Sequence, residues 1–363
     1  MKAMSVFLLV VIAASVPGVA QDASVSNIDS IFTPLADGKS PGIAVLVRKD
    51  GRTVFERGYG VADLRSLRKI DGKTDFRLAS FTKQFTAMAI MLLVHDGKLR
   101  YDQRITDVFP DFPAYGRSIT IRHLLTHTGG LPDYEDLMGS NWTAIHQIQD
   151  DEVLSLLEHQ TAPKFAAGTQ WAYSNSGYVV LGLVVAKVSG VPFWEFLHDR
   201  IFGPLAMNQT IAFVKGANVV PHRAYGHTKE ASGFVETDQS STSATLGDGG
   251  VYSNLEDLAK WDAALAAHTL MSEKEMQVAL TPVKLDDQSE PTAEGKPVLY
   301  GFGWFLDPYK GHPRMWHSGS TIGFRTVIDR FTSDKLTVVI LCNRTDLDPS
   351  ELALKVVDVL WKQ

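Results

Sequence analysis

Strand-like segments lie at both ends of this chain, and their placement constrains the fold more than any other feature. Near the N-terminus, "GIAVLVRKDG" and "RTVFERGYGVAD" predict two strands joined by a turn at Lys49-Asp50-Gly51. Near the C-terminus, further segments predict successive antiparallel strands: "LYGFGWFLD", "RMWHSGS", "GFRTVIDRF" and "KLTVVILCN". We therefore predict an α+β fold in which one antiparallel sheet is assembled from both ends of the chain.

The region between these ends is expected to form an inserted, mostly helical lobe. Its clearer helical pieces are "ITIRHLLTHTGGLPDY", "DEVLSLLEHQ", "YVVLGLVVAKVSG" and "NLEDLAKWDAALAAH". We place this lobe at about residues 100–290 and the α/β lobe at about 27–99 and 291–363. Helices in "SNIDSIFTPL" and "PSELALKVVDVLWKQ" would cover the sheet. A small-molecule site is expected between the two lobes.

The N-terminus has the pattern of a secretory signal peptide, which we assign to residues 1–20. Lys2 precedes an apolar run at residues 6–14, and Gly18 and Ala20 form a small-x-small cleavage site. The apolar run is shorter than the roughly 20 residues that span a bilayer, and no later segment is long and apolar enough. The mature chain, residues 21–363, is therefore expected to be exported, periplasmic or secreted, without an integral membrane segment.

Composition and residue spacing argue against several other classes of function. The formal net charge is -6 and no basic run occurs, so a nucleic-acid partner is not expected. The single cysteine, Cys342, lies in the apolar "LTVVILCN" and is expected to be a core residue rather than a catalytic thiol. His123 and His127 have the four-residue spacing of metal ligands, but they lack the glutamate of H-E-x-x-H and a third ligand. We favour a structural role for the "HTGGLPDY" turn and expect no metal and no cofactor.

A serine and a lysine open the apolar segment "FRLASFTKQFTAMAIMLLVHDGKL". We predict one helix from Phe76 to Leu99, with Gly97 as its C-cap. Ser80 and Lys83 are three residues apart, so a helix places the hydroxyl and the amine on one face. Backbone N–H groups at a helix start can hold an oxyanion, and a lysine in apolar surroundings can accept the hydroxyl proton. The alternative is that Ser80 caps the helix and Lys83 extends to solvent.

Two further polar motifs lie in the middle and near the end of the chain. Tyr173-Ser174-Asn175 precedes an apolar helix. A tyrosine oxygen near a lysine can carry a proton, and an asparagine amide can bond a substrate amide. His317-Ser318-Gly319-Ser320 lies on or beside a strand, where Gly319 permits close backbone approach to a ligand. Taken alone, the first motif fits a turn with an N-cap, and the second is a weak signal.

With "DGKLRYDQRITDVFPDFP", "GDGGVYSNLEDLAKW" and "HSGSTIGF", these motifs give the chain a clear resemblance to one family of serine hydrolases. That family includes class C β-lactamases, penicillin-binding DD-peptidases, D-aminopeptidases and family VIII carboxylesterases. The resemblance covers nearly all of the mature chain, and it implies the β-lactamase/transpeptidase-like fold.

The resemblance also implies a catalytic apparatus. Ser80 would be the nucleophile, and Lys83 and Tyr173 would handle the protons, with the choice of acylation base between them left open. The oxyanion hole would consist of the backbone N–H groups of Ser80 and Ser320, an arrangement of fixed donors that stabilises charge in the transition state.

The substrate-binding residues implied by the resemblance are Asn175, His317, Ser318 and Gly319. His317 stands where class C β-lactamases carry the lysine of K-T-G, and in this respect the chain is more similar to penicillin-binding peptidases. Because an unperturbed histidine has a pKa of about 6.5, we expect His317 to recognise a substrate carboxylate mainly when it is protonated.

These implications predict an exported serine acyl-hydrolase with an acyl-Ser80 intermediate, either a penicillin-binding D-Ala-D-Ala carboxypeptidase or a D-aminopeptidase. The alternatives are a family VIII-type carboxylesterase, a class C-like β-lactamase, and a catalytically silent penicillin-binding sensor. The substrate would be a small molecule or peptide, namely a peptidoglycan-like peptide, an ester or a β-lactam. The retained Ser80, Lys83 and Tyr173 argue against the silent sensor.

Overall fold

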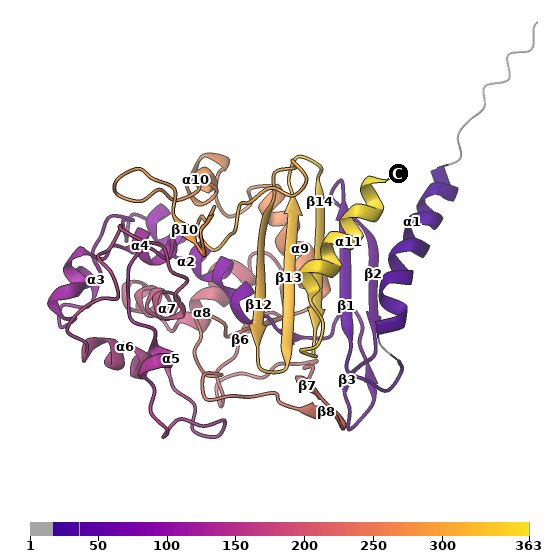
Figure 1. Ribbon diagram of the computed structural model, residues 1–363, viewed down its shortest axis with the longest axis horizontal. Coiled ribbons are helices and arrows are strands. Elements are labelled where there is room, and N and C mark those ends of the chain that lie inside the picture. The colour runs from indigo at the N-terminus through magenta and orange to yellow at the C-terminus, as the bar shows by residue number, and fades with distance from the viewer. Residues whose placement is uncertain (1–16, 36, 363) are drawn as a thin grey trace, which may run out of the picture.

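A five-stranded antiparallel sheet forms the centre of the computed structural model, which describes residues 17–35 and 37–362 (Figure 1). Its strands, in spatial order, are β12 (Met315–Thr321), β13 (Phe324–Phe331), β14 (Leu336–Cys342), β1 (Ile43–Lys49) and β2 (Arg52–Tyr59). The N-terminal β1 pairs directly with the C-terminal β14, so the two ends of the chain close one sheet. This confirms the predicted fold class.

The predicted hairpin between β1 and β2 forms as the sequence indicates. Asp50 and Gly51 have φ angles of 49° and 75°, which match the left-handed backbone of a tight two-residue turn. The segment "LYGFGWFLD" is different, and its prediction as a sheet strand is wrong. It makes only isolated bridges, Tyr300 with Phe305 and Phe305 with Trp316, because Gly303 at φ 74° reverses the chain between them.

The two faces of the sheet pack against different helices. Alternate residues such as Ile43 and Val45 join a cluster with α1 (Pro17–Phe32) and α11 (Pro349–Trp361), and the buried Cys342 belongs to this cluster. The intervening residues of the same strands face the larger cluster, which includes α2 (Lys83–His95) and α9 (Leu255–Ala266). In Figure 1, β12 is the edge of the sheet nearest the helical part of the molecule.

The middle of the chain is mostly helical, and α7 packs against both α2 and α6. Its α-helices are α3 (Ile105–Val108), α4 (Ile121–Leu125), α5 (Tyr134–Leu137), α6 (Asp150–Glu158), α7 (Asn175–Ser189), α8 (Phe193–Leu197) and α10 (Glu273–Ala279), with a π-helical turn at His198–Phe202. Although α9 lies within the range expected for the helical lobe, it packs against β1 and β14. The lobe boundaries therefore stay a prediction.

Short strands complete the fold, and one small sheet lies beside the candidate site. It consists of β5 (Phe76–Arg77), β9 (Val251–Ser253) and β6 (Ile211–Ala212). The other pairs are β3 (Val61–Asp63) with β4 (Arg68–Lys69), β7 (His227–Glu230) with β8 (Gly233–Glu236), and β10 (Thr292–Ala293) with β11 (Lys296–Pro297).

The segment predicted as one helix from Phe76 to Leu99 contains three elements. Strand β5 is followed by a 3₁₀ turn at Ala79–Thr82, and α2 begins only at Lys83, so the predicted helix start is wrong. The pairing of β5 with β9 fixes the first two residues in extended form. The helix also ends earlier than the predicted Leu99, at His95 with Asp96 as its C-cap. Gly97, the predicted C-cap, follows at φ 69° and allows the chain to leave the helix.

The structure describes only part of the N-terminal segment for which a signal peptide was predicted. Of the expected signal peptide, residues 1–16 lie outside the described residues. Within 17–35 and 37–362, no single helix is long and apolar enough to cross a membrane. Helix α7 and the stretch Phe193–Phe202 meet the length and composition criteria only as a pair, and that pair is bent by 81°.

Candidate active site

Ser80 lies in a strained connection between β5 and α2. The Leu78 N–H donates to Val251 O at 2.9 Å, and the next residue, Ala79, has a φ of 52°, which is unusual for a residue with a side chain. This reversal presents Ser80, partly exposed, at the start of the 3₁₀ turn. Its N–H therefore lies at the positive end of a helical segment that continues into α2.

Lys83 is completely buried one turn later and makes three hydrogen bonds. Its Nζ donates to Asn175 Oδ1 and to Asp248 O, both at 2.9 Å, and lies 3.2 Å from Ser80 Oγ. The alternative that Lys83 extends to solvent is therefore wrong. Two of its partners are neutral oxygens that fix the ammonium position, and the third is the predicted nucleophile.

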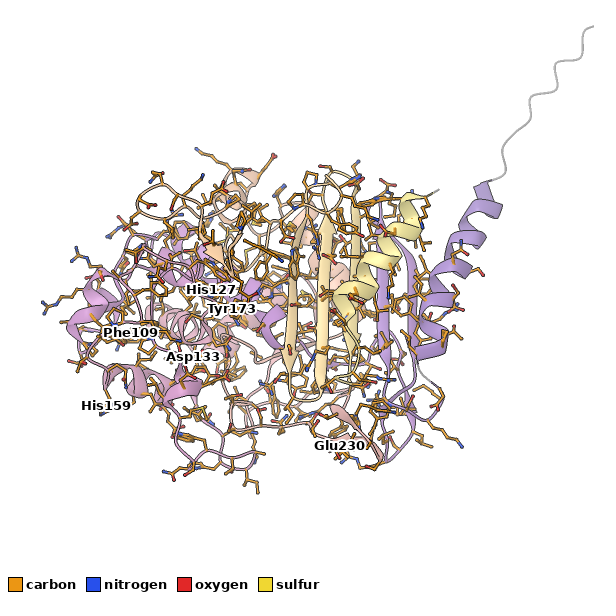
Figure 2. The ribbon with its side chains drawn as sticks, viewed as in Figure 1. Phe109, His127, Asp133, His159, Tyr173 and Glu230 are labelled. Atoms are coloured by element: carbon orange, nitrogen blue, oxygen red, sulfur yellow. The ribbon has the colours of Figure 1, made fainter. Side chains whose placement is uncertain are left out.

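Tyr173 is held beside Lys83 by a histidine from the helical part. The Ala172 N–H donates to His127 O at 3.0 Å, and the Ser174 N–H donates to His127 Nδ1 at 3.1 Å. The rings of Tyr173 and His127 are in contact, with centroids 4.4 Å apart (Figure 2). Lys83 Nζ lies 4.8 Å from the centroid of the Tyr173 ring. His127 therefore has the structural role that we favoured.

Asn175 begins α7 and is fixed at both ends of its amide. Its Oδ1 accepts from Lys83, and its Nδ2 donates to Glu135 Oε1 at 3.2 Å. Ser174 caps the helix by accepting from the Gly177 N–H at 3.0 Å. The amide group thus has a single orientation, with its oxygen toward the lysine.

Glu135 is a functional candidate that the sequence reasoning missed. It lies in α5, directly after "LPDY", and its side chain is exposed to solvent beside Asn175. Desolvation by neighbouring atoms and repulsion from Asp133 raise the pKa of the Glu135 carboxyl. A carboxylate among other acidic groups is a good partner for a cation. Only the acidic "PDYED" run could have indicated this residue in advance.

The edge strand β12 presents backbone donors toward the site. Trp316 exchanges both of its backbone hydrogen bonds with Phe305, so its N–H points away from β13. Because a strand alternates with a period of two, the N–H groups of Ser318 and Ser320 also face this open edge. Gly319 lies so close to the Leu78 carbonyl that a Cβ would overlap it, which brings β12 against the residues that precede Ser80.

His317 is buried and neutral, which corrects the expectation that it gains charge near neutral pH. Burial and the nearby Lys83 lower its pKa to about 3. Its Nδ1–H donates to Ser318 O at 2.6 Å, so Nε2 is free to accept from the Tyr300 hydroxyl at 3.3 Å. His317 therefore supports the backbone of the edge strand and provides no cation for a substrate carboxylate.

The family model described as Beta-lactamase matches residues 28–359 of the chain. This chain belongs to the beta-lactamase family. A penicillin-binding protein of Bacillus subtilis is 31% identical over 343 residues, which cover 90% of this chain and 74% of the relative. A D-aminopeptidase of Cereibacter sphaeroides is 26% identical, over 84% of this chain and 57% of the relative. The predicted family is confirmed.

Solved structures agree with this beta-lactamase family assignment. An octameric penicillin-binding protein homologue from Pyrococcus abyssi has a TM-score of 0.75 at 26% identity, covering 95% of this chain and 77% of that one. A D-amino acid amidase from Ochrobactrum anthropi has the same fold, with a TM-score of 0.79, 24% identity and coverage of 94% and 99%. The protein is thus a serine hydrolase of this family.

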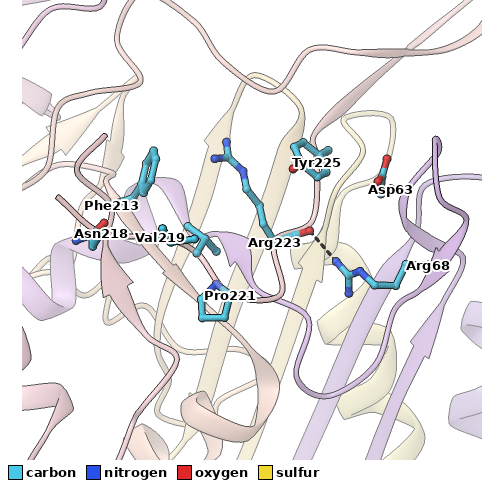
Figure 3. Close-up of a pocket in the computed structure, with 9 residues that line it drawn as sticks. Asp63, Arg68, Phe213, Asn218, Val219, Pro221, Arg223 and Tyr225 are labelled. Carbon is cyan, nitrogen blue, oxygen red and sulfur yellow. Dashed lines mark hydrogen bonds between the residues drawn. The ribbon is translucent and has the colours of Figure 1, made fainter. Parts of the chain in front are cut away.

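Two other features that could have indicated a site have structural partners instead. His123 Nδ1 accepts from the Thr120 N–H at 3.2 Å in a helix cap, whereas His127 holds the Tyr173 segment, so the two have separate partners. A pocket elsewhere, drawn in Figure 3, has no serine, lysine or histidine among its lining residues. Its Arg68 donates to Arg223 O at 2.7 Å and serves to hold the loop. The catalytic roles assigned around Ser80 stay predictions.

Proposed function

We propose that this serine hydrolase cleaves amide bonds that follow a D-amino acid, working from the free amino end as an aminopeptidase or amidase. The observation that carries the proposal is the position of Lys83 Nζ, 3.2 Å from Ser80 Oγ and 2.9 Å from Asn175 Oδ1. This places a proton acceptor, a nucleophile and an amide group in one cluster, in which Lys83 is buried and Ser80 and Asn175 are partly exposed.

The proposed reaction passes through an ester on Ser80. Ser80 Oγ attacks the substrate carbonyl, its proton moves to the Lys83–Tyr173 pair, and that pair returns a proton to the leaving amine as the C–N bond breaks. Water then attacks the ester, its proton passes through the same pair to Ser80 Oγ as the C–O bond breaks, and the acid is released. The N–H groups of Ser80 and Ser320 would hold the oxyanion in both steps. Whether Lys83 or Tyr173 takes the first proton is left open.

Glu135 supports recognition of an amine rather than a carboxylate. Its carboxylate lies beside Asn175, in reach of a substrate bound at that amide, and Asp133 adds negative charge. The neutral His317 offers no counter-charge for a terminal carboxylate. A relative of this chain is named a D-aminopeptidase, which is consistent with the same preference. We therefore favour an aminopeptidase or amidase over a D-Ala-D-Ala carboxypeptidase.

The decisive experiment compares D-alanine p-nitroanilide with its N-acetyl derivative, which lacks the ammonium group. Glu135→Gln should lower kcat/KM for the free amine about tenfold or more, since a charge-assisted hydrogen bond is lost. It should leave the N-acetyl substrate unchanged. Asp136→Asn, an exposed carboxylate of the same helix, is the matched control. Equal loss for both substrates would show that Glu135 does not bind the amine.

The pH dependence of the same ratio gives an independent check. Glu135 binds an ammonium only when ionised, so the preference for the free amine should fall as the pH drops through the raised pKa of Glu135. It should also fall as the substrate amine deprotonates, near pH 8. Glu135→Gln should flatten the ratio at both the acidic and the basic end, because neither ionisation then affects binding through a Glu135–ammonium pair.

A substrate panel separates this proposal from the other activities considered. Turnover of p-nitrophenyl esters without any amide would indicate a carboxylesterase, and efficient nitrocefin hydrolysis would indicate a β-lactamase. Release of D-alanine from D-Ala-D-Ala peptides that are blocked at the amino end would indicate a carboxypeptidase. Covalent labelling by a penicillin with no turnover of any substrate would indicate a sensor.

We also propose that the enzyme is exported, on the basis of the leader pattern in residues 1–20. Expression of the full chain in a bacterial host, followed by cell fractionation and N-terminal sequencing, tests this. A cytoplasmic protein that retains its first 20 residues would contradict export.

A further inference from the structure

A second polar cluster lies at the opposite end of the sheet face that contacts the candidate site. Met315, Arg330, Thr337 and Arg48 are cross-strand neighbours in one row over β12, β13, β14 and β1. Asp262, on α9, lies over this row. Its Oδ1 accepts from Arg330 Nε at 2.8 Å and from Thr337 Oγ1 at 2.7 Å, and its Oδ2 accepts from Arg48 Nε at 2.8 Å.

The cluster carries more positive than negative charge. Two buried guanidinium groups share the single carboxylate of Asp262, whose oxygens are already occupied by three donors. A second nitrogen of Arg48 also has a partner within the protein, because Nη2 donates to Gly51 O at 2.8 Å. An uncompensated buried charge is costly, so an anion that entered this cluster would be stabilised.

Of the two arginines, Arg330 has the N–H donors with the weaker hydrogen-bond partners. It is only 6% exposed, and the nearest partner of its Nη1 is the thioether sulfur of Met315 at 3.3 Å, which is a weak acceptor. Its Nη2 donates to Asp262 O at the long distance of 3.3 Å. A carboxylate is a far better partner for these two nitrogens, because it can accept from both at once.

Arg330 and Arg48 also line a cavity. Its volume is about 620 Å³, which is within the range of about 300–1,000 Å³ found for small-molecule sites. Its charged lining consists of Arg48, Arg330 and Lys335 together with the carboxylates of Asp50, Asp262 and Glu273. Apolar side chains from α9, the α10 segment and the sheet complete it, namely Leu265, Met276, Leu280, Met315 and Phe331. A ligand here would have a charged head and an apolar body.

We propose that this cavity binds a small aliphatic carboxylate, with its head on Arg330 Nη1 and Nη2 and its tail between α9, α10 and the sheet. A purely structural role for the ion cluster explains how α9 is fixed to the sheet, but it explains neither the weakly bonded Nη groups nor the cavity. The site is separate from Ser80. Met315 and Gly319 are four residues apart on β12, about 13 Å in an extended strand.

The test is a calorimetric titration of the mature chain with octanoate and, separately, with 1-octanol. Octanoate should bind at least tenfold more tightly, because only it carries the carboxylate. Arg330→Gln should remove this difference. Saturating octanoate should leave kcat/KM of the wild-type enzyme for a small substrate unchanged, whereas octanoate bound in the candidate active site would compete with that substrate. Equal affinities for the two compounds, or no octanoate binding below millimolar concentration, would overturn the proposal.

A second variant keeps the test decisive if Arg330→Gln does not fold. Ala266 is exposed and lines the cavity, so Ala266→Trp should fill the entrance without disturbing the ion cluster. Octanoate binding should be lost, whereas Ala231→Trp, an exposed alanine outside the cavity, should bind normally. Unchanged affinity in Ala266→Trp would show that octanoate binds elsewhere.

Discussion

The two ends of one sheet face bury cations in opposite ways. Near Ser80, the ammonium of Lys83 is bonded to a hydroxyl, an amide and a backbone carbonyl, and among the described residues no carboxylate lies within hydrogen-bond distance. At the other end, Arg48 and Arg330 are bonded directly to Asp262. A carboxylate strongly favours the charged form of a neighbouring cation. Neutral acceptors hold the cation in position but favour its charged form less. The first arrangement suits proton transfer, and the second suits structural attachment.

An apolar row separates these two ends. Ile328, Val339 and Leu46 are cross-strand neighbours on the same face, between the row of Gly319 and the row of Arg330. Sites that are separated by a packed layer and share no partner usually act independently. Variants at the Ser80 end should therefore change activity with little loss of stability. Variants at the arginine end should lower stability with little change in activity.

The largest expected effect is that of Ser80→Ala. Removing the nucleophile should abolish hydrolysis and covalent labelling by a fluorophosphonate, while the free energy of unfolding changes by less than about 1 kcal/mol, since Ser80 is partly exposed. Ser232→Ala, at an exposed turn, is the control. Near-wild-type turnover by Ser80→Ala would show that Ser80 is not the nucleophile and that this end of the sheet face is not the catalytic one.

The next effect concerns the pair that handles protons. Lys83→Met and Tyr173→Phe should each lower kcat by orders of magnitude, and the double variant should lose little more, because residues acting as one unit are strongly non-additive. Single-turnover measurements with an ester substrate provide the rates. Fully multiplicative losses would show that the two side chains act independently.

The sequence predicted the catalytic end better than the arginine end, for a physical reason. Ser80 and Lys83 belong to one short segment whose local geometry sets their spacing, so the S-x-x-K pattern could suggest them. It indicated the family only together with Tyr173-Ser174-Asn175 and the motif that begins at His317. Arg48 and Asp262 are 214 positions apart, and their bond depends on how α9 packs on the sheet. Glu135 was missed for the same reason, because its importance comes from Asn175, 40 positions later.

Local sequence also fails where tertiary contacts override it. The apolar "FRLAS" was predicted to be helical, yet β9 pairs with Phe76 and Arg77 and holds them extended. His317 was expected to titrate near pH 6.5, because a single sequence does not show that Lys83 and a closed aromatic environment surround it. In contrast, β1, β13 and β14 are rich in β-branched and apolar residues, and they were predicted as strands together with β2 and β12.

The third effect tests the arginine end through stability. Asp262→Asn leaves two buried guanidinium groups without their carboxylate and should cost about 3–5 kcal/mol in the free energy of unfolding. At a temperature where the variant is folded, kcat/KM should equal that of the wild type. Asp102→Asn breaks an exposed pair with Arg100 and should cost about 0–1 kcal/mol. Denaturant titrations measure both, and a small loss in Asp262→Asn would show that the cluster does not fix α9.

The acid limb of the stability curve sharpens this third test. Desolvation alone would raise the pKa of Asp262, but Arg330, Thr337 and Arg48 together hold it below its usual value. A lowered pKa in the folded state contributes stability that is present above the unfolded pKa of about 3.9 and is lost as the pH falls below it. Asp262→Asn should therefore show a shallower loss of stability below about pH 4 than the wild type.

The smallest expected effect is at His317, which lies next to the apolar row. Because its pKa is about 3, fewer than about one molecule in 100 carries charge there at pH 5.5. The ratio of kcat/KM for a free-carboxylate peptide to that for its amide should therefore stay constant between pH 5.5 and 8. His317→Gln should keep this flat profile, because glutamine is neutral too. His317→Lys should raise the ratio by adding a cation at the site. A wild-type ratio that falls as the pH rises would mean that a bound carboxylate draws a proton onto His317. The site around Ser80 would then bind its substrate with a cation that titrates, His317. Its contrast with the arginine cluster, where Arg48 and Arg330 are always charged, would be weaker.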